Sequence, residues 1–360
     1  MSVADRKTGE MSEMSDTGTP LIEARDIRQV FGNDKKGGTV ALNSLSFSIS
    51  ADTPSFTAIV GESGSGKTTL ARILMGLLTP THGTVRYRGA DMRTMGSKAQ
   101  ERFRRDVQAI FQDPFEVYNP FYKVDHLLTV PISRFHLAKN RTEARLLMEN
   151  ALRAVGLRPE ETLGRYPHQL SGGQRQRITV ARALLLKPRL IVADEPVSMV
   201  DASLRATILE SLRKLNQDFG ISFFYITHDL TTAYQVSDNI VVLYQGHVVE
   251  TGDVERVIKD PQHPYTQLLV ASIPLPDPTR RWGEEVVPGG RGGGVVANQC
   301  PFADRCPHVM PVCREAVPPL YRTEPHRAVS CYLYRDGAST FEGDITEVFR
   351  AQTVAAVGGS

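Results

Sequence analysis

The stretch GESGSGKTT, Gly61 to Thr69, constrains the fold of this chain more than any other feature. It has the spacing G-x-x-x-x-G-K-[ST], it follows the apolar run SFTAIV, and it opens the helix-like segment KTTLARILMGLL. A buried strand, a glycine-rich turn and a helix in this order direct backbone N–H groups and the positive end of the helix at a phosphate. The stretch therefore predicts a phosphate-binding loop at the end of a strand.

The side chains of this loop predict a nucleoside triphosphate as the ligand, with Mg²⁺. Lys67 would bring its charge to the β- and γ-phosphates, and the Thr68 hydroxyl can coordinate the metal ion. A chance glycine-rich turn would lack the strand, the lysine and the helix together. The predicted nucleotide-binding residues of the loop are Gly61, Ser63, Gly64, Ser65, Gly66, Lys67, Thr68 and Thr69.

Strand-like and helix-like segments alternate along the rest of the chain. RLIVADE and ISFFYITHD are continuous apolar runs, and each is followed by a segment with helical spacing. This alternation predicts an α/β fold with a mainly parallel sheet flanked by helices on both faces. TVALNSLSFSI alternates apolar and polar residues like a half-buried strand, and residues from about 115 to 186 are mostly helical.

An acidic pair ends one of the buried strands. In RLIVADEP the apolar run stops at Asp194 and Glu195. Asp194, beside the phosphate loop, can hold Mg²⁺ through water, and Glu195 can polarise an attacking water as a general base. An acidic pair at a strand end is often only structural, but together with the phosphate loop it favours a hydrolytic site.

Composition excludes several other classes of protein. The chain of 360 residues is 41% hydrophobic and 23% charged, with a formal net charge of +2, which is too close to balance to favour nucleic acid or an anionic membrane as a partner. The first 20 residues are polar and lack the apolar core of a signal peptide. No apolar run approaches the length of a transmembrane helix. We therefore expect a soluble, cytoplasmic protein.

The stretch LSGGQRQR, Leu170 to Arg177, is similar to the signature of ATP-binding subunits of ABC transporters. With the phosphate loop and the acidic strand, it identifies the chain as resembling that family. The resemblance implies a head-to-tail dimer that sandwiches two nucleotides, each between the phosphate loop of one subunit and the signature of the other. Residues Ser171, Gly172, Gly173 and Gln174 would then contact the γ-phosphate held by the opposite subunit.

Four further motifs follow in the order of the family. Phe31 in QVFG matches the aromatic residue that stacks on adenine, although the insertion NDKKGG follows it and a plain strand-edge aromatic is the alternative. Gln112 in IFQDP matches the glutamine that senses Mg²⁺ and touches the membrane partner. Asp201 ends SMVD, where the family more often has Ala-Leu in the middle, and belongs to the loop that crosses the dimer interface. His228 in ITHD matches the switch histidine near the γ-phosphate, although an isolated strand-end histidine is more often structural.

These matches give two predicted sets. The predicted catalytic residues are Glu195, His228 and Gln112, and the predicted Mg²⁺ ligands are Thr68, Gln112 and Asp194. Because both halves of the ATP site look intact, the resemblance implies an active ATPase with ATP and Mg²⁺ as its cofactors.

All four cysteines lie in one window, at Cys300, Cys306, Cys313 and Cys331. The segment HPYTQLLVASIPLPDP and the pattern CPFADRCP resemble the oligopeptide, dipeptide and nickel importer branch of the family, whose members carry a [4Fe–4S] cluster in a C-terminal extension. The resemblance thus implies such a cluster. From the residues alone, four thiolates suit Zn²⁺ as well as a cluster. The spacing C-x5-C-x6-C-x17-C is wider than the close pairs of structural zinc sites, and thiols without a metal remain open.

The predicted architecture is a P-loop ABC-ATPase core with an antiparallel β subdomain and a helical signature subdomain, followed by a small extension rich in proline and glycine. The expected segments are a disordered leader, the nucleotide-binding domain, the extension and a flexible tail, at residues 1–20, 21–262, 263–335 and 336–360. The helical subdomain is expected at about 115–186.

The resemblance implies the ATP-hydrolysing, energy-coupling subunit of an importer, peripheral at the cytoplasmic face of the inner membrane. Its partners would be two membrane permease subunits, a second, similar ATP-binding subunit or a second copy of this chain, and a solute-binding protein that acts through the permeases. The alternative is a soluble ABC-type ATPase that acts on nucleic acid or ribosomes. The single core and the near-neutral charge disfavour it. The sequence does not encode whether the cargo is a peptide, a nickel chelate or an oligosaccharide.

Overall fold

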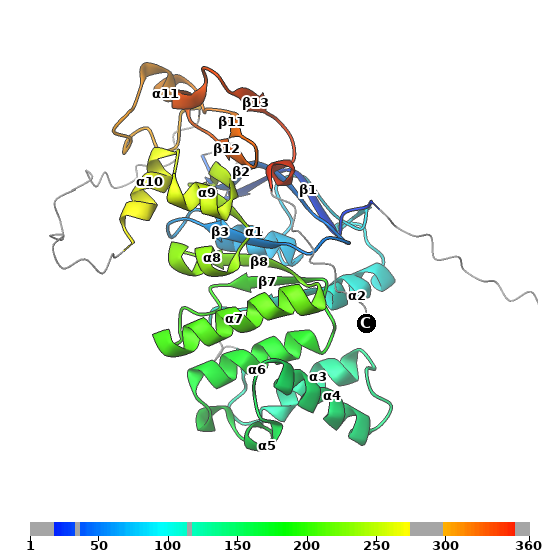
Figure 1. Ribbon diagram of the computed structural model, residues 1–360. Coiled ribbons are helices and arrows are strands. Elements are labelled where there is room, and N and C mark those ends of the chain that lie inside the picture. Colours follow the sequence, from blue (N-terminus) through cyan, green and yellow to red (C-terminus); the bar gives the residue numbers. More distant parts are fainter. Residues whose placement is uncertain (1–17, 33–36, 114–116, 274–297, 350–360) are drawn as a thin grey trace, which may run out of the picture.

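The computed structural model of the protein describes residues 18–32, 37–113, 117–273 and 298–349. A nine-stranded sheet in the order β13-β11-β12-β10-β9-β3-β8-β7-β6 runs through the molecule (Figure 1). Its parallel part consists of β6 (Val107–Ile110), β7 (Leu190–Asp194), β8 (Ser222–Thr227), β3 (Phe56–Val60) and β9 (Asn239–Tyr244). The mainly parallel sheet predicted from the apolar runs is therefore present.

Both faces of the parallel strands are buried, and alternate residues of one strand enter different cores. In β8, Phe223 and Tyr225 pack into one hydrophobic cluster, whereas Phe224 and Ile226 pack into the other. This alternation follows from the period of two along a strand, and it explains why these strands read as continuous apolar runs. The helices around the strands include α1 (Lys67–Leu74), α7 (Ala202–Phe219) and α8 (Leu230–Val236).

A separate four-stranded antiparallel sheet forms the predicted β subdomain. Its order is β2-β1-β4-β5, with β1 (Ile22–Phe31), β2 (Thr39–Ile49), β4 (His82–Tyr87) and β5 (Ala90–Asp91). Apolar residues of β1 and β2 share one hydrophobic cluster with α1, so this sheet covers the helix that follows the phosphate loop. Helix α2 (Ser97–Asp106) then leads into β6.

Between β6 and β7 the regular elements of the described residues are helical, and they form the end of the molecule drawn lowest in Figure 1. The elements are α3 (Asp125–Arg134), α4 (Arg141–Ala154), α5 (Pro159–Thr162), the 3₁₀ turn η3 (Pro167–Gln169) and α6 (Gly172–Leu184). Helix α6 carries the signature at its N-terminus and packs against the core at its other end, because Val180 and Ala183 belong to the main hydrophobic cluster.

The C-terminal extension continues the central sheet. After β10 (His247–Asp253), α9 (Val254–Lys259) and α10 (Pro264–Ala271), the chain returns through α11 (Pro311–Glu315) to β11 (Leu320–Glu324) and β12 (Arg327–Val329). Strand β12 pairs antiparallel with β10, which joins extension and core by backbone hydrogen bonds. A buried ion pair supports the junction, since Arg327 Nε lies 3.3 Å from a Glu250 oxygen and both side chains are at most 1% exposed.

A flexible tail is expected at 336–360, but the chain is ordered as far as residue 349. After η4 (Tyr332–Tyr334), strand β13 (Ser339–Phe341) pairs with β11, and η5 (Ile345–Val348) follows. Asp344 accepts a hydrogen bond from the Ser48 backbone N–H at 3.1 Å, and Val348 is 1% exposed. A sequence with little periodicity is thus ordered by contacts with β2, which are distant along the chain. Residues 350–360, and residues 1–17 of the expected leader, lie outside the described residues.

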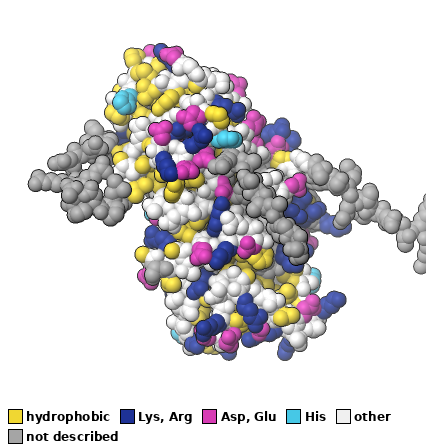
Figure 2. Space-filling view, viewed as in Figure 1, with side chains coloured by type: hydrophobic (Ala, Val, Ile, Leu, Met, Phe, Trp, Pro, Cys, Tyr) yellow, Lys and Arg dark blue, Asp and Glu magenta, His cyan; other side chains and the backbone are white. Residues whose placement is uncertain are grey.

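In the described part of the chain, no helix combines the length and the apolar character that crossing a membrane requires. Figure 2 shows basic and acidic side chains intermingled over the visible face, in line with the near-balanced net charge.

Candidate active site

The phosphate loop turns sharply out of β3 and requires glycine at two positions. Gly61 has φ 153°, and a Cβ atom there would lie 2.1 Å from the carbonyl oxygen of Leu243. Gly66 has φ 104°, and its Cβ atom would lie 2.3 Å from the carbonyl oxygen of Ala41. The loop is therefore packed against β9 and β2 so closely that a side chain at either position would displace backbone.

Lys67 projects into the curve of this loop. Its ammonium donates to the carbonyl oxygens of Gly61 and Glu62 at 2.7 and 2.8 Å, and the residue is 7% exposed. Burial lowers the pKa of Lys67, and the nearby carboxylates of Glu195 and Asp194 oppose that change. The Lys67 ammonium is thus buried at the first turn of α1, close to the carboxylates of Glu195 and Asp194.

The acidic pair lies at the end of β7, next to the loop. Burial raises the pKa of Asp194, and the charge of Glu195 adds to the rise, while Lys67 and a hydrogen bond from Thr68 oppose it. Glu195 adopts a left-handed backbone with φ 46°, and its N–H donates to the Ile226 carbonyl oxygen at 2.8 Å. This turn follows directly after β7, and it costs backbone energy in a residue other than glycine.

His228 follows the neighbouring strand β8 and contacts the Glu195 side chain. Its Nδ1 lies 2.8 Å from Glu195 Oε1, and the imidazole is largely exposed whereas the carboxylate is largely buried. The pair comes together because the carboxyl ends of parallel strands meet at one edge of the sheet. The histidine therefore restrains the rotamer of the carboxylate that sequence reasoning assigns as the base.

Lys67, Glu195 and His228 line one cleft of about 720 Å³. Its walls are formed by Ala41, Ser63, Gly64, Gly66, Lys67, Thr68, Thr69, Gln112, Glu195 and His228. All of these except Ala41 are residues that the sequence predicted for the nucleotide or for catalysis. Gly61, Ser65 and Asp194 belong to the same loop and strand end but are not among the residues that line the cleft.

The signature residues and Asp201 do not reach this cleft. Ser171 caps α6, with its hydroxyl accepting from the Gln174 N–H at 3.2 Å, while the Gln174 side chain accepts from the Ser171 N–H at 2.9 Å. A Cβ atom on Gly173 would lie 2.9 Å from Leu204, so the signature packs beside the start of α7, where Asp201 is the residue before the helix. Phe31 ends β1 with 45% exposure and likewise does not line the cleft.

The four cysteines are neighbours with free thiols. Cys300, Cys313 and Cys331 are buried, Cys306 is half-buried, and the Cys300 N–H donates to the Cys313 carbonyl oxygen at 2.8 Å. Burial raises the pKa of Cys300 to about 11 and that of Cys331 to about 12, and the other thiols contribute to both shifts. Within the described ranges, however, no group of three or more His, Cys, Asp or Glu residues is placed so that it could hold a metal ion. The four thiols are suitable donors for a metal, but their arrangement in this structure does not form a metal site. A metal at the cysteines therefore stays a prediction.

Sequence reasoning missed two residues that contact the phosphate loop, Tyr265 and Arg305. Tyr265 accepts a hydrogen bond from the Glu62 N–H at 2.8 Å, and Arg305 binds the Glu62 carboxylate with distances of 2.9 and 3.1 Å. Arg305 belongs to the CPFADRCP pattern, but 243 positions separate it from its partner and nothing in the sequence pairs them.

Comparisons with known proteins place the chain in a family. The ABC transporter family profile matches residues 42–198, and the profile of the oligopeptide/dipeptide transporter C-terminal region matches residues 249–313. The putative oligopeptide transport ATP-binding protein YkfD of Bacillus subtilis is 42% identical over 321 residues, which cover 88% of this chain and 96% of that protein. The chain belongs to the oligopeptide/dipeptide branch of ABC transporter ATP-binding subunits. AppF of the same organism, an oligopeptide transport ATP-binding protein, is 36% identical and covers 87% of this chain and 97% of its own.

Solved structures agree on the fold of this ABC ATPase. The dimeric structure of MJ0796, a bacterial ABC transporter cassette, has a TM-score of 0.58 and 28% identity, and it covers 65% of this chain and 99% of its own. CbiO1 of Clostridium perfringens has 24% identity and a TM-score of 0.58, and the match covers 67% of this chain and 92% of CbiO1. At this identity it supports the fold alone. This chain is thus an ATPase, the energy-coupling subunit of an ABC importer. Nothing in these comparisons favours the alternative of a soluble ATPase on nucleic acid or ribosomes.

Proposed function

We propose that this ATPase powers the uptake of oligopeptides or dipeptides through a pair of membrane permeases. The C-terminal region profile and relatives such as the putative peptide import ATP-binding protein BOV_A0347 of Brucella ovis, 37% identical over 88% of this chain, support a peptide substrate. The observation that carries the enzymatic part is the cleft in which Lys67, Glu195 and His228 meet.

The test is transport in vesicles that contain the purified complex with its permeases and solute-binding protein. We expect ATP inside the cytoplasmic compartment to drive accumulation of labelled di- and oligopeptides. Uptake of a nickel chelate or an oligosaccharide, with none of peptides, would contradict the substrate and leave the ATPase assignment intact. Mass spectrometry of the same complex would identify the permeases and show whether the second ATP-binding subunit is a different chain or a copy of this one.

The proposed chemistry is attack of water on the γ-phosphate. Glu195 would accept the proton of that water, and His228 would hold the Glu195 carboxylate in position through their 2.8 Å contact. The loop amides and Lys67 would bind the phosphates, and Phe31 would stack on the adenine. Thr68, Asp194 and Gln112 would hold Mg²⁺, which prefers oxygen ligands and supplies charge neutralisation at the β- and γ-phosphates when bound. The hydrogen bond between the Thr68 hydroxyl and the Asp194 carboxylate supports this oxygen-donor set.

The signature is proposed to serve a second subunit. The signature residues Ser171, Gly172, Gly173 and Gln174 lie away from the cleft of their own chain, at the capped N-terminus of a 13-residue helix. The similar cassette MJ0796 is dimeric, which supports a pair of subunits, and in the proposed pair this helix end would face the partner's nucleotide. Asp201, beside the signature, would then lie at the dimer interface. Ser171→Arg should leave nucleotide binding by the single subunit intact and abolish dimer closure, measured by cross-linking.

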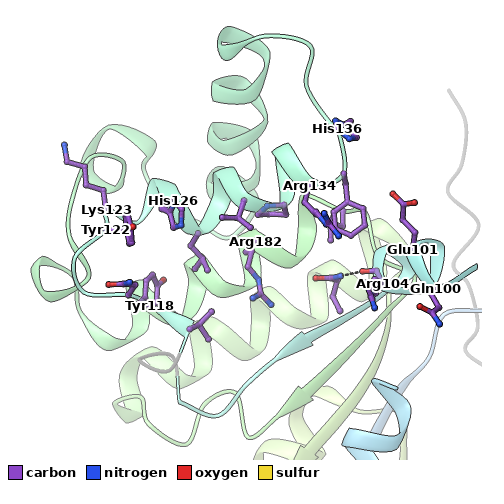
Figure 3. A pocket seen from close by; sticks show the side chains of 18 of the residues that line it. Gln100, Glu101, Arg104, Tyr118, Tyr122, Lys123, His126, Arg134, His136 and Arg182 are labelled. Carbon is purple, nitrogen blue, oxygen red and sulfur yellow. Dashed lines mark hydrogen bonds between the residues drawn. The ribbon is translucent and has the colours of Figure 1, made fainter. Parts of the chain in front are cut away.

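The permeases are proposed to dock in the groove that Figure 3 shows between α2, the segment before α3, α3 and α6. This cavity of about 910 Å³ combines aromatic and apolar walls with basic side chains such as Arg134 and Arg182. Near it, Phe121 is 86% and Tyr122 is 51% exposed. Gln176 of α6 donates to the Phe111 carbonyl oxygen at 3.4 Å, which connects the groove with the segment that carries Gln112. An acidic, partly apolar loop of the permease fits these features, and it would hold the subunit peripherally at the cytoplasmic face of the membrane.

The cysteines are proposed to bind a [4Fe–4S] cluster, with Zn²⁺ as the alternative. Their support is the four neighbouring thiols, three of them buried, in an extension of the matched C-terminal type. Protein purified anaerobically with iron supplied should be brown and contain about four irons per chain. One zinc without iron would contradict the cluster, and protein without metal would leave four ordinary thiols. The role is proposed as structural, since none of the ATP-site residues lies among the cysteines.

A further inference from the structure

The second residue of the phosphate loop is held from three directions. The Glu62 N–H donates to the Tyr265 hydroxyl at 2.8 Å, its carbonyl oxygen accepts from Lys67 at 2.8 Å, and its carboxylate accepts from both terminal nitrogens of Arg305 at 2.9 and 3.1 Å. Two of these three anchors come from the C-terminal part of the chain. The conformation of the loop is therefore tied to residues outside the nucleotide-binding motifs.

Arg305 is itself held rigidly. It stands in the loop between Cys300 and Cys306, and its guanidinium lies 5.6 and 5.8 Å from the ring centroids of Phe302 and Tyr244. Phe302 is 2% exposed and meets Tyr244 edge-to-face at 5.3 Å. A planar guanidinium stacked in this way presents its two nitrogens to a carboxylate in a fixed geometry. The ion pair thus joins two structured elements, and both belong to the ordered part of the fold.

We propose that Arg305 is a positioning residue for nucleotide binding, which fixes the phosphate loop through Glu62 and couples it to the cysteine-bearing loop 300–306. The other side of the loop supports this role. Gly61 packs against the Leu243 carbonyl, so the loop has little freedom to move toward β9, and Arg305 restrains the neighbouring residue from the extension. The proposal rests on the assignment of the phosphate loop as the nucleotide site.

Coupling of this kind works in both directions. If the cysteine loop stabilises the phosphate loop in its binding conformation, nucleotide must stabilise the cysteine loop by the same factor. The Glu62 and Arg305 side chains are 42% and 21% exposed, so solvent weakens the pair. We therefore expect loss of the pair to weaken nucleotide binding only about 3- to 10-fold.

The experiment is titration of the full-length chain with a fluorescent ATP analogue. Arg305→Ala and Glu62→Gln should each weaken binding about 3- to 10-fold, and the double variant should be no weaker than either single one, because both remove the same contact. Arg305→Lys keeps the charge without the fork and should fall between wild type and Arg305→Ala. The matched control is Arg314→Ala, which removes an exposed pair with Asp304 in the same extension and should bind like wild type.

Hydrogen exchange of backbone amides in the cysteine loop is a second measurement, and loss of packing alone would not change its response to nucleotide. In wild type, saturating ATP analogue should slow exchange of the Ala303 and Arg305 amides, which bond within the cysteine loop. In Glu62→Gln, where Arg305 keeps its aromatic neighbours, this protection should disappear. Wild-type affinity and protection in Glu62→Gln and Arg305→Lys would overturn the proposal. Loss of binding in Lys67→Ala in the same assay would show that the nucleotide site itself stands, whereas wild-type protein that fails to bind ATP would overturn the site.

Discussion

Sequence motifs predict both the nucleotide cleft and the cysteine extension, but the two regions differ in how the structure arranges the motif residues. In the cleft, groups from β3, β7, β8 and the segment after β6 converge on one edge of the sheet. In the extension, four thiols are neighbours and three are buried, yet they form no metal-binding group with the other residues that the structure describes. Parallel strands bring their carboxyl ends to one edge whatever their loops do. The described loops of the extension have no such template, and the extension is joined to the core by the pairing of β12 with β10.

The largest effect should come from the base in the cleft. Glu195→Gln keeps the size of the side chain and its contact distance to His228 but removes the proton acceptor, so ATP turnover of the assembled complex should fall about 10²–10⁴-fold. Nucleotide binding should remain near that of wild type. The control is Glu210→Gln, which changes an exposed carboxylate on α7 that pairs with Lys214. Near-normal turnover in Glu195→Gln would remove Glu195 from the mechanism.

The second prediction tests whether the extension is separable from the core. Arg327→Met leaves Glu250 buried without its cation and should lower the free energy of unfolding by about 3–5 kcal/mol. Combining it with Glu250→Gln should recover part of that loss, because no unpaired charge then remains. If the extension were an independent unit, Arg327→Met would leave the unfolding temperature of the core and the affinity for nucleotide unchanged. We expect both the unfolding temperature, measured by calorimetry, and the affinity, measured by titration, to decrease.

The third prediction concerns the cation of the cleft. Lys67→Ala removes a buried charge that faces the bound phosphates, and affinity for ATP should fall about 10- to 100-fold. Lys259→Ala is the matched control, since Lys259 pairs with Glu255 on the exposed side of α9. The loss of affinity in Lys67→Ala should be larger than the loss in Arg305→Ala, because Lys67 contacts the phosphates directly whereas Arg305 only positions the loop. Equal losses would contradict that order.

The smallest effect should appear at the junction between the two regions. His263 caps α10 by accepting from the Tyr265 N–H at 3.0 Å, and burial lowers its pKa to about 3. Since the unfolded chain takes up this proton near pH 6.5, the folded state loses stability as pH falls below that value. His263→Asn keeps an acceptor that does not titrate. Between pH 7 and 5, wild type should lose up to about 1.4 kcal/mol per pH unit more than the variant, measured by denaturant unfolding. Parallel pH profiles would contradict the buried neutral state.

The parts of this protein that depend on local sequence pattern could be predicted from the residues alone. GESGSGKTT, RLIVADEP and ITHD carry their strand, turn and chemistry in consecutive residues, so the α/β fold and most of the residues that line the cleft could be predicted. The capping of α6 by Ser171 is likewise local. The family resemblance added the order of motifs and the type of C-terminal extension, which the comparisons support.

The contacts between the extension and the core could not be predicted from the sequence, because they are made by residues that are distant along the chain. The pairing of β12 with β10, the buried Glu250–Arg327 pair and the Arg305–Glu62 contact each join residues that are at least 75 positions apart. Such contacts leave no periodicity in the sequence, because each partner alone is an ordinary polar residue. Residues 336–349 have no core of their own, and burial against β2 and β11 supplies the order that their composition does not predict.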